Sequence, residues 1–165
     1  MRAAIAACLA LAAMLLPKAA EAGLSCQFNA AQFPMTFSYD PVSRSAATAT
    51  ATISFTCTGI KRNGSPITIS ANGGTNGAPA NREMKRLQSP NDLLGYAASL
   101  NASESPVYGD GTSGTQIYAT TLYPASDGVA ITFNVYGQIA AAIPGGAGDV
   151  HAGTYNDGVI LTLTY

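Results

Sequence analysis

The chain has few of the side chains that carry acid–base or metal chemistry. Its 165 residues include one histidine, no tryptophan and three cysteines, and only 10% of them are charged. Because an ordinary soluble domain carries about 25% charged residues, hydroxyl, amide and small side chains must cover much of this surface. Eight Lys and Arg against nine Asp and Glu give a net charge of −1. Binding to nucleic acid or to an anionic membrane is disfavoured, since both need clustered basic charge.

The first 22 residues have the pattern of a cleaved export signal. Arg2 supplies a positive start, Ala3 to Leu16 form an apolar run too short to span a membrane, and Ala20-Glu21-Ala22 fits a small-x-small cleavage site. We therefore expect a signal peptide at residues 1–22 and a single exported domain at residues 23–165, with no transmembrane segment. A buried N-terminal helix is the alternative interpretation.

The cysteines left after cleavage form an even pair. Cys8 leaves with the signal peptide, so Cys26 and Cys57 remain. In an exported chain this pair predicts one disulfide. Two free thiols or a metal-binding pair are the alternatives, although His151 is the only imidazole available to complete a metal site.

A strict alternation of apolar and polar residues runs through the segment 47–58. Its odd positions from Ala49 to Cys57 are apolar, and its even positions are all threonine or serine. Alternation with period two is typical of a β-strand with one buried face and one solvated face. Cys57 lies on the apolar face, so we expect the disulfide to be buried between layers.

Other segments alternate in the same way and are separated by turn residues. They are 67–71, 94–100, 129–136 and 159–165, with a further strand around 26–28 and another around 33–37. Short strands at regular spacing, separated by glycine- and asparagine-rich turns, are typical of an antiparallel sandwich. We therefore predict an all-β antiparallel sandwich of about six strands.

The predicted mature chain has one basic cluster, the run Asn81-Arg82-Glu83-Met84-Lys85-Arg86, which holds three of its six basic residues. A solvated edge strand or loop is the simpler interpretation, because Lys and Arg discourage edge-to-edge pairing. A ligand-binding patch is the alternative.

We expect no catalytic, metal or cofactor site. The chain has no G-x-S-x-G motif, and most carboxylates stand beside glycine or proline, as turn residues do. The turn Gly109–Thr112 offers one carboxylate, too few for calcium. His151 lies in a glycine-rich stretch and is predicted to be a surface loop residue whose replacement leaves function unchanged. The chain is therefore predicted not to be an enzyme.

Several short motifs follow Cys26 in a defined order. They are Phe37-Ser38-Tyr39-Asp40-Pro41, Ala51–Thr58, Ile67–Gly74, Arg82-Glu83-Met84, Leu94-Gly95-Tyr96, Tyr108–Thr112, Phe133–Ile139 and Gly153–Val159. This ordered set resembles the spore coat protein U domain family, which includes the pilins of archaic chaperone–usher pili. Tyr108 stands where the family usually has tryptophan. The resemblance implies an immunoglobulin-like sandwich, no enzyme activity, transit through the periplasm to the cell surface or medium, and a role in surface assembly, adhesion or biofilm.

The resemblance also implies partners and a place to bind them. An immunoglobulin-like sandwich of the constant type has seven strands, whereas about six are predicted here. Chaperone–usher pilins lack their final strand, and a partner's segment fills the resulting groove by strand addition. We expect one side of that groove to be lined by Val159, Leu161, Leu163 and Tyr165. The implied partners are a periplasmic chaperone, an outer-membrane usher and other pilin subunits.

Donation of a strand to another subunit is not expected. Cleavage after Ala22 leaves three residues before Cys26, which span at most about 10 Å and are too short for a donor strand. We therefore expect a subunit at the tip or chain end, which accepts a strand without donating one. Two alternatives are a self-complemented monomer, with the N-terminal segment or Gly145–His151 closing the groove, and a stand-alone secreted module recognising a surface or glycan.

Overall fold

The computed structural model describes residues 23–29, 33, 35–42, 45–88, 92–103, 105–140 and 150–165. The predicted signal peptide lies outside these residues, as does most of Gly145–His151. Ten strands and one short 3₁₀-helix (η1, Pro124–Ser126) occur in the described part of the chain. The strands are β1 (Ser25–Phe28), β2 (Thr36–Tyr39), β3 (Ala47–Thr58), β4 (Ser65–Ala71), β5 (Arg82–Arg86), β6 (Leu93–Ser99), β7 (Tyr118–Leu122), β8 (Ala130–Ile139), β9 (Gly153–Asn156) and β10 (Leu161–Thr164).

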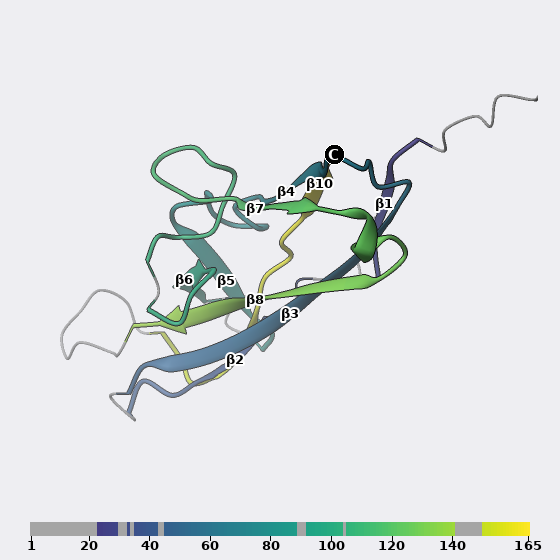
Figure 1. Ribbon diagram of the computed structural model, residues 1–165. Helices are drawn as coiled ribbons and strands as arrows, with labels where there is room; N and C mark the ends of the chain where they lie inside the picture. The colour runs from purple at the N-terminus through teal and green to yellow at the C-terminus, as the bar shows by residue number, and fades with distance from the viewer. Residues whose placement is uncertain are drawn as a thin grey trace, which may run out of the picture.

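The strands form two antiparallel sheets. A curved seven-stranded sheet has the order β1-β3-β8-β6-β5-β9-β2, and a smaller sheet has the order β10-β4-β7 (Figure 1). The predicted all-β antiparallel sandwich is confirmed. The estimate of about six strands was too low, because β5, β7 and β9 were not recognised as strands. β5 is mostly charged, and β7 and β9 are short and have little apolar alternation.

β3 is the longest strand, and its side chains alternate between the buried and the solvent-facing sides of the large sheet. Its residues Ala51, Ile53, Phe55 and Cys57 are at most 2% exposed, whereas its threonines point outward. It pairs with β8 along a register that runs from Ala47↔Ile139 to Thr56↔Ala130. Because side chains alternate along a strand, the register of this ladder determines that one face of the sheet is apolar and buried and the other is rich in hydroxyl groups.

The buried side chains form two neighbouring clusters. The larger cluster lies on the inner side of the seven-stranded sheet and includes Phe37, Met84, Val135 and Tyr155. The smaller cluster lies between the two sheets. Its buried members are Phe55, Cys57, Ile60, Ile67, Ile69 and Leu122. The rings of Tyr118 and Phe133 stack with centroids 4.0 Å apart and contact both clusters. The core is therefore continuous from one sheet to the other.

The predicted disulfide between Cys26 and Cys57 is confirmed. The two residues are directly opposite each other in the β1–β3 ladder, with Cα atoms 4.1 Å apart. The bridge joins neighbouring strands of one sheet on its inward face, where Cys57 is fully buried. It therefore ties the short edge strand β1 to the longest strand of the sheet.

Arg82 corrects the interpretation of the basic run as a solvated edge. β5 lies inside the large sheet, between β6 and β9, and Arg82 is only 1% exposed. Its guanidinium donates to the backbone carbonyl oxygens of Tyr108 at 2.6 Å, Asn72 at 2.8 and 3.1 Å, and Pro79 at 3.0 Å. A buried charge is tolerated only when it is well hydrogen-bonded, and carbonyl oxygens fill that role here.

Asn72 extends this anchor to the last strand. Its backbone N–H donates to the carbonyl of Ile160, and its side-chain Oδ1 accepts from the N–H of Ile160 at 2.9 Å. Asp157, four residues before β10, accepts from the hydroxyl of Tyr96 at 2.8 Å and from the N–H of Thr75 at 2.8 Å. The polar contacts of Arg82, Asn72 and Asp157 therefore fix the chain where it enters β10.

We expect reduction of the disulfide to lower the free energy of unfolding by about 2–5 kcal/mol, because the 31-residue separation constrains the unfolded chain. Denaturant unfolding with and without reductant measures the effect. Intact mass should rise by two hydrogen atoms on reduction. Two thiols that alkylate readily in the freshly exported protein would contradict the prediction.

Replacement of Arg82 should be far more damaging than replacement of a neighbouring exposed cation. Arg82→Met leaves buried carbonyl groups without donors, so we expect a loss of about 3 kcal/mol or more in the free energy of unfolding. Lys85→Met on the same strand is the control, since Lys85 is exposed, and it should change that value by less than about 0.5 kcal/mol. Equal effects of the two variants in denaturant unfolding would show that the buried guanidinium is not an anchor.

Candidate functional site

Two strands at the boundary between the sheets each have one side without a strand neighbour in the described part of the chain. β1 pairs only with β3, and β10 pairs only with β4 (Figure 1). Both strands contact the smaller core cluster, β1 through Cys26 and Phe28 and β10 through Leu161 and Leu163. We call the region formed by β1, β10 and their shared apolar side chains the β1/β10 edge.

Burial decreases from the centre of the smaller cluster toward this edge. Phe55, Cys57, Ile67 and Ile69 are fully buried. By contrast, the cluster members at the edge are only partly buried: Leu24, Cys26, Phe28, Leu161 and Leu163. The β1/β10 edge therefore carries apolar side chains whose cover is incomplete.

The four residues predicted to line a groove lie in different environments. Leu161 and Leu163 point inward from β10, opposite Ala71 and Ile69 of β4. Val159 lies before β10 and is 8% exposed, within the larger cluster. Tyr165 follows β10 and is 54% exposed. The structure thus places Leu161 and Leu163 at the shared edge and leaves Val159 in the core.

Sequence reasoning did not identify the residues on the β1 side of this edge. Leu24, Cys26 and Phe28 alternate with more exposed neighbours, which is a detectable period-two signal over only five residues. Neither β1 nor β10 contains a charged residue or a proline. Natural edge strands are usually protected from pairing by charge, proline or bulges, so these two edges lack the common sequence-level protection.

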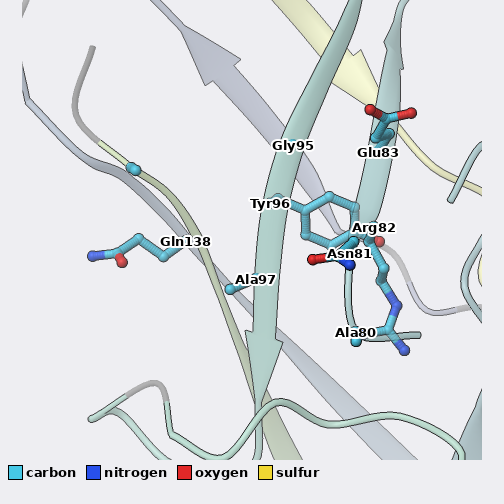
Figure 2. A pocket seen from close by; sticks show the side chains of 9 residues that line it. Ala80, Asn81, Arg82, Glu83, Gly95, Tyr96, Ala97 and Gln138 are labelled. Atoms are coloured by element: carbon cyan, nitrogen blue, oxygen red, sulfur yellow. The ribbon is translucent and has the colours of Figure 1, made fainter. Parts of the chain in front are cut away.

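A second feature is a shallow hollow of about 380 Å³ on the large sheet (Figure 2). Gln138 of β8 lies on one side of β6, and Asn81, Arg82 and Glu83 lie on the other. Gly95 and Ala97 line it from β6, and room is left there because glycine has no Cβ and alanine has only a methyl group. The described lining residues of the hollow include one carboxylate, Glu83, and no nucleophile paired with a base, so these residues form no catalytic constellation.

His151 is half exposed, as expected of a loop residue, but it is not isolated. Its ring Nδ1 lies 2.8 Å from Oδ2 of Asp92, and its backbone N–H donates to the same oxygen at 3.0 Å. These contacts, the backbone bond first, hold the pKa of the Asp92 carboxyl below its ordinary value. The pair joins the residue before β6 to the segment before β9.

Among the described residues, no group of three or more His, Cys, Asp or Glu side chains is placed to hold a metal ion. In the same residues no helix has the length and apolar character needed to cross a membrane.

The Asp92–His151 contact predicts a loss of stability in acid. A carboxyl whose pKa is depressed in the folded state contributes stability above its unfolded pKa of about 3.9, and that contribution disappears as pH falls through the lower folded value. We therefore expect the free energy of unfolding to fall below about pH 4, and Asp92→Asn to remove part of this dependence. Asp110 has its pKa lowered chiefly by the N–H of Thr112, so Asp110→Asn should remove a separate part. A pH profile of Asp92→Asn identical to that of the unmodified protein would contradict the assignment.

Comparison with known proteins identifies the family of this chain. A family model for the Spore Coat Protein U domain matches residues 12–162. The match begins within the predicted signal peptide and reaches into β10. A comparison with curated proteins finds no match. This family consists in general of pilus- or fimbria-type proteins with an extracellular or surface location, and it is structural and not known for enzymatic activity. The chain therefore belongs to the Spore Coat Protein U domain family.

Proposed function

We propose that this protein is a subunit of a surface pilus or fibre and that the β1/β10 edge accepts a strand from a partner. The supporting observation is that two uncharged edge strands, one from each sheet, share partly covered apolar side chains. An added strand would pair with exposed backbone groups at this edge. Its alternate apolar side chains would cover Leu161, Leu163 and Phe28.

Two features of the edge favour strand addition: backbone groups without a strand partner and apolar side chains that are partly exposed. An edge strand presents backbone N–H and C=O groups that pair readily with another extended segment. Partly exposed leucine and phenylalanine side chains gain free energy when they are removed from water, at about 25 cal/mol per Å². One inserted strand would pair with the backbone groups and cover the apolar side chains, which is the recognition mode called β-augmentation.

The route and position in the fibre follow from this proposal and the family. We propose that a periplasmic chaperone covers the β1/β10 edge in transit, that an outer-membrane usher exports the subunit, and that another pilin subunit then supplies the final strand. Cleavage after Ala22 would leave too little chain ahead of Cys26 to donate a strand, which favours a tip or chain-end position. Adhesion or biofilm formation is the role proposed for such a subunit.

The inward residues of β10 provide a direct test with matched controls. We expect Leu161→Asn and Leu163→Asn to weaken binding of a synthetic donor peptide of alternating apolar and polar residues by roughly tenfold each, since each loses about 1.5 kcal/mol of apolar burial. Thr162→Asn and Thr164→Asn place the same side chain on the outward face and should bind the peptide like the unmodified protein. Peptide binding is measured by fluorescence anisotropy after periplasmic expression with and without the cognate chaperone.

Two outcomes of this experiment would contradict strand addition at the β1/β10 edge. A protein that is monomeric, soluble and thermally stable without the chaperone, and that does not respond to the peptide, would show that the sandwich is already complete. Equal losses in the inward and outward variants would show that the peptide binds elsewhere.

A further inference from the structure

Charge is almost absent from the strands of this protein. Every charged residue in the ten described strands lies in β5, and the other nine strands contain none. The outward face of β3 consists of threonine and serine, and the outward residues of β8 opposite it include Asn134, Tyr136 and Gln138. A broad part of the large sheet therefore presents hydroxyl and amide groups without fixed charge.

Tyr136 is the aromatic residue of this surface. It lies on the outward face of β8, opposite Thr50 of β3 and Ser99 of β6. Inward aromatic residues of the core form ring pairs, some stacked and others tilted or edge-on, whereas Tyr136 forms no ring pair with any described residue. It is half-buried, so part of its side chain is open to solvent.

The hollow described above begins two residues further along β8. Gln138 lines the hollow, is opposite Ala97 of β6, and faces the same side of the sheet as Tyr136. Residues i and i+2 of a strand are about 6.7 Å apart, so the ring and the amide form one continuous surface. Among the described residues, the side chains of Asn81, Glu83, Tyr136 and Gln138 make no hydrogen bond or ion pair, which leaves their polar groups available to a ligand.

We propose that this surface binds a neutral glycan, with a sugar ring against Tyr136 and a neighbouring sugar unit in the hollow. We call it the Tyr136 face, formed by Thr50, Asn81, Glu83, Gly95, Tyr136 and Gln138. The proposal is independent of strand addition, because the β1/β10 edge uses other residues. A volume of about 380 Å³ is at the small end of the range for ligand sites and suits a sugar unit.

The chemistry of the lining selects an uncharged polyol. Sugar hydroxyls both donate and accept hydrogen bonds, which matches amide groups that do the same and a carboxylate that accepts. The guanidinium of Arg82, the cation in the lining, is buried and already donates to backbone carbonyl oxygens. An anionic ligand in the hollow would therefore meet the Glu83 carboxylate, because the exposed Lys85, two residues further along β5, is not among the described lining residues. The apolar side of a sugar ring, in turn, is suited to the exposed part of an aromatic side chain.

The test measures binding of the purified exported protein to an array of neutral and anionic glycans. We expect binding to one or more neutral glycans, and no binding that requires a sulfate or carboxylate on the sugar. Tyr136→Ala should weaken binding by roughly tenfold, Gln138→Ala should weaken it several-fold, and Tyr136→Phe should retain most of it because the ring remains. Tyr123→Ala is the matched control. Tyr123 is 57% exposed and lies just beyond β7, outside the Tyr136 face, and its loss should leave glycan affinity unchanged.

A titration of the unmodified protein with a glycan that binds on the array locates the site, because amide chemical shifts change at the residues that the glycan contacts. Shifts at Gly95, Ala97 and Gln138, with none at Leu161 or Leu163, would support the proposal even if Tyr136→Ala failed to fold. The proposal is overturned if no neutral glycan binds, if only anionic glycans bind, or if Tyr123→Ala loses as much affinity as Tyr136→Ala. Shifts confined to β1 and β10 would also overturn it, because they would assign the glycan to the strand-acceptor edge.

Discussion

The alternation of side chains along β3 is the constraint on which the rest of this structure depends. A shift of one residue in its pairing with β8 would expose Ile53, Phe55 and Cys57 and bury a row of hydroxyl groups. The correct register therefore sets the core, the inward position of the disulfide and the uncharged outer face together. On the other side of β3, Cys57 is directly opposite Cys26 in the β1–β3 ladder, and β1 and β10 both contact the smaller cluster.

The structure combines a closely packed interior with edges that lack the usual protection. Arg82 and Asn72 secure the entry to β10 through a chain of hydrogen bonds, so one side of the β1/β10 edge is fixed in place. The edge itself has partly covered leucines and no charge to discourage pairing. In a protein that stays alone this arrangement is an aggregation hazard. In a subunit that is to receive a strand, the same features keep the edge competent for pairing.

The sequence predicted the features that depend on local pattern. Alternation identified β3, β4, β6, β8 and β10, and the even cysteine count identified the disulfide. It did not identify β5, because the burial of Arg82 depends on the carbonyl groups of Asn72 and Tyr108, which lie 10 and 26 residues away. The β1/β10 edge was predicted only in part, because some of its residues are brought there by contacts distant in the sequence. Leu161 and Leu163 follow from alternation, whereas Phe28 joins them only through the pairing of β1 with β3, and Val159 is taken into the larger cluster by tertiary packing.

Amide hydrogen exchange, measured residue by residue on the isolated protein and again after addition of a donor strand, tests the central claim most directly. The account predicts slow exchange throughout β3 and β8 in both states, because these strands form the longest ladder of the sheet. It predicts fast exchange at the unpaired amides of β1 and β10 in the isolated protein and strong protection of those amides once the strand is added. Amides of β1 and β10 that are already as protected as those of β3 in the isolated monomer would contradict it.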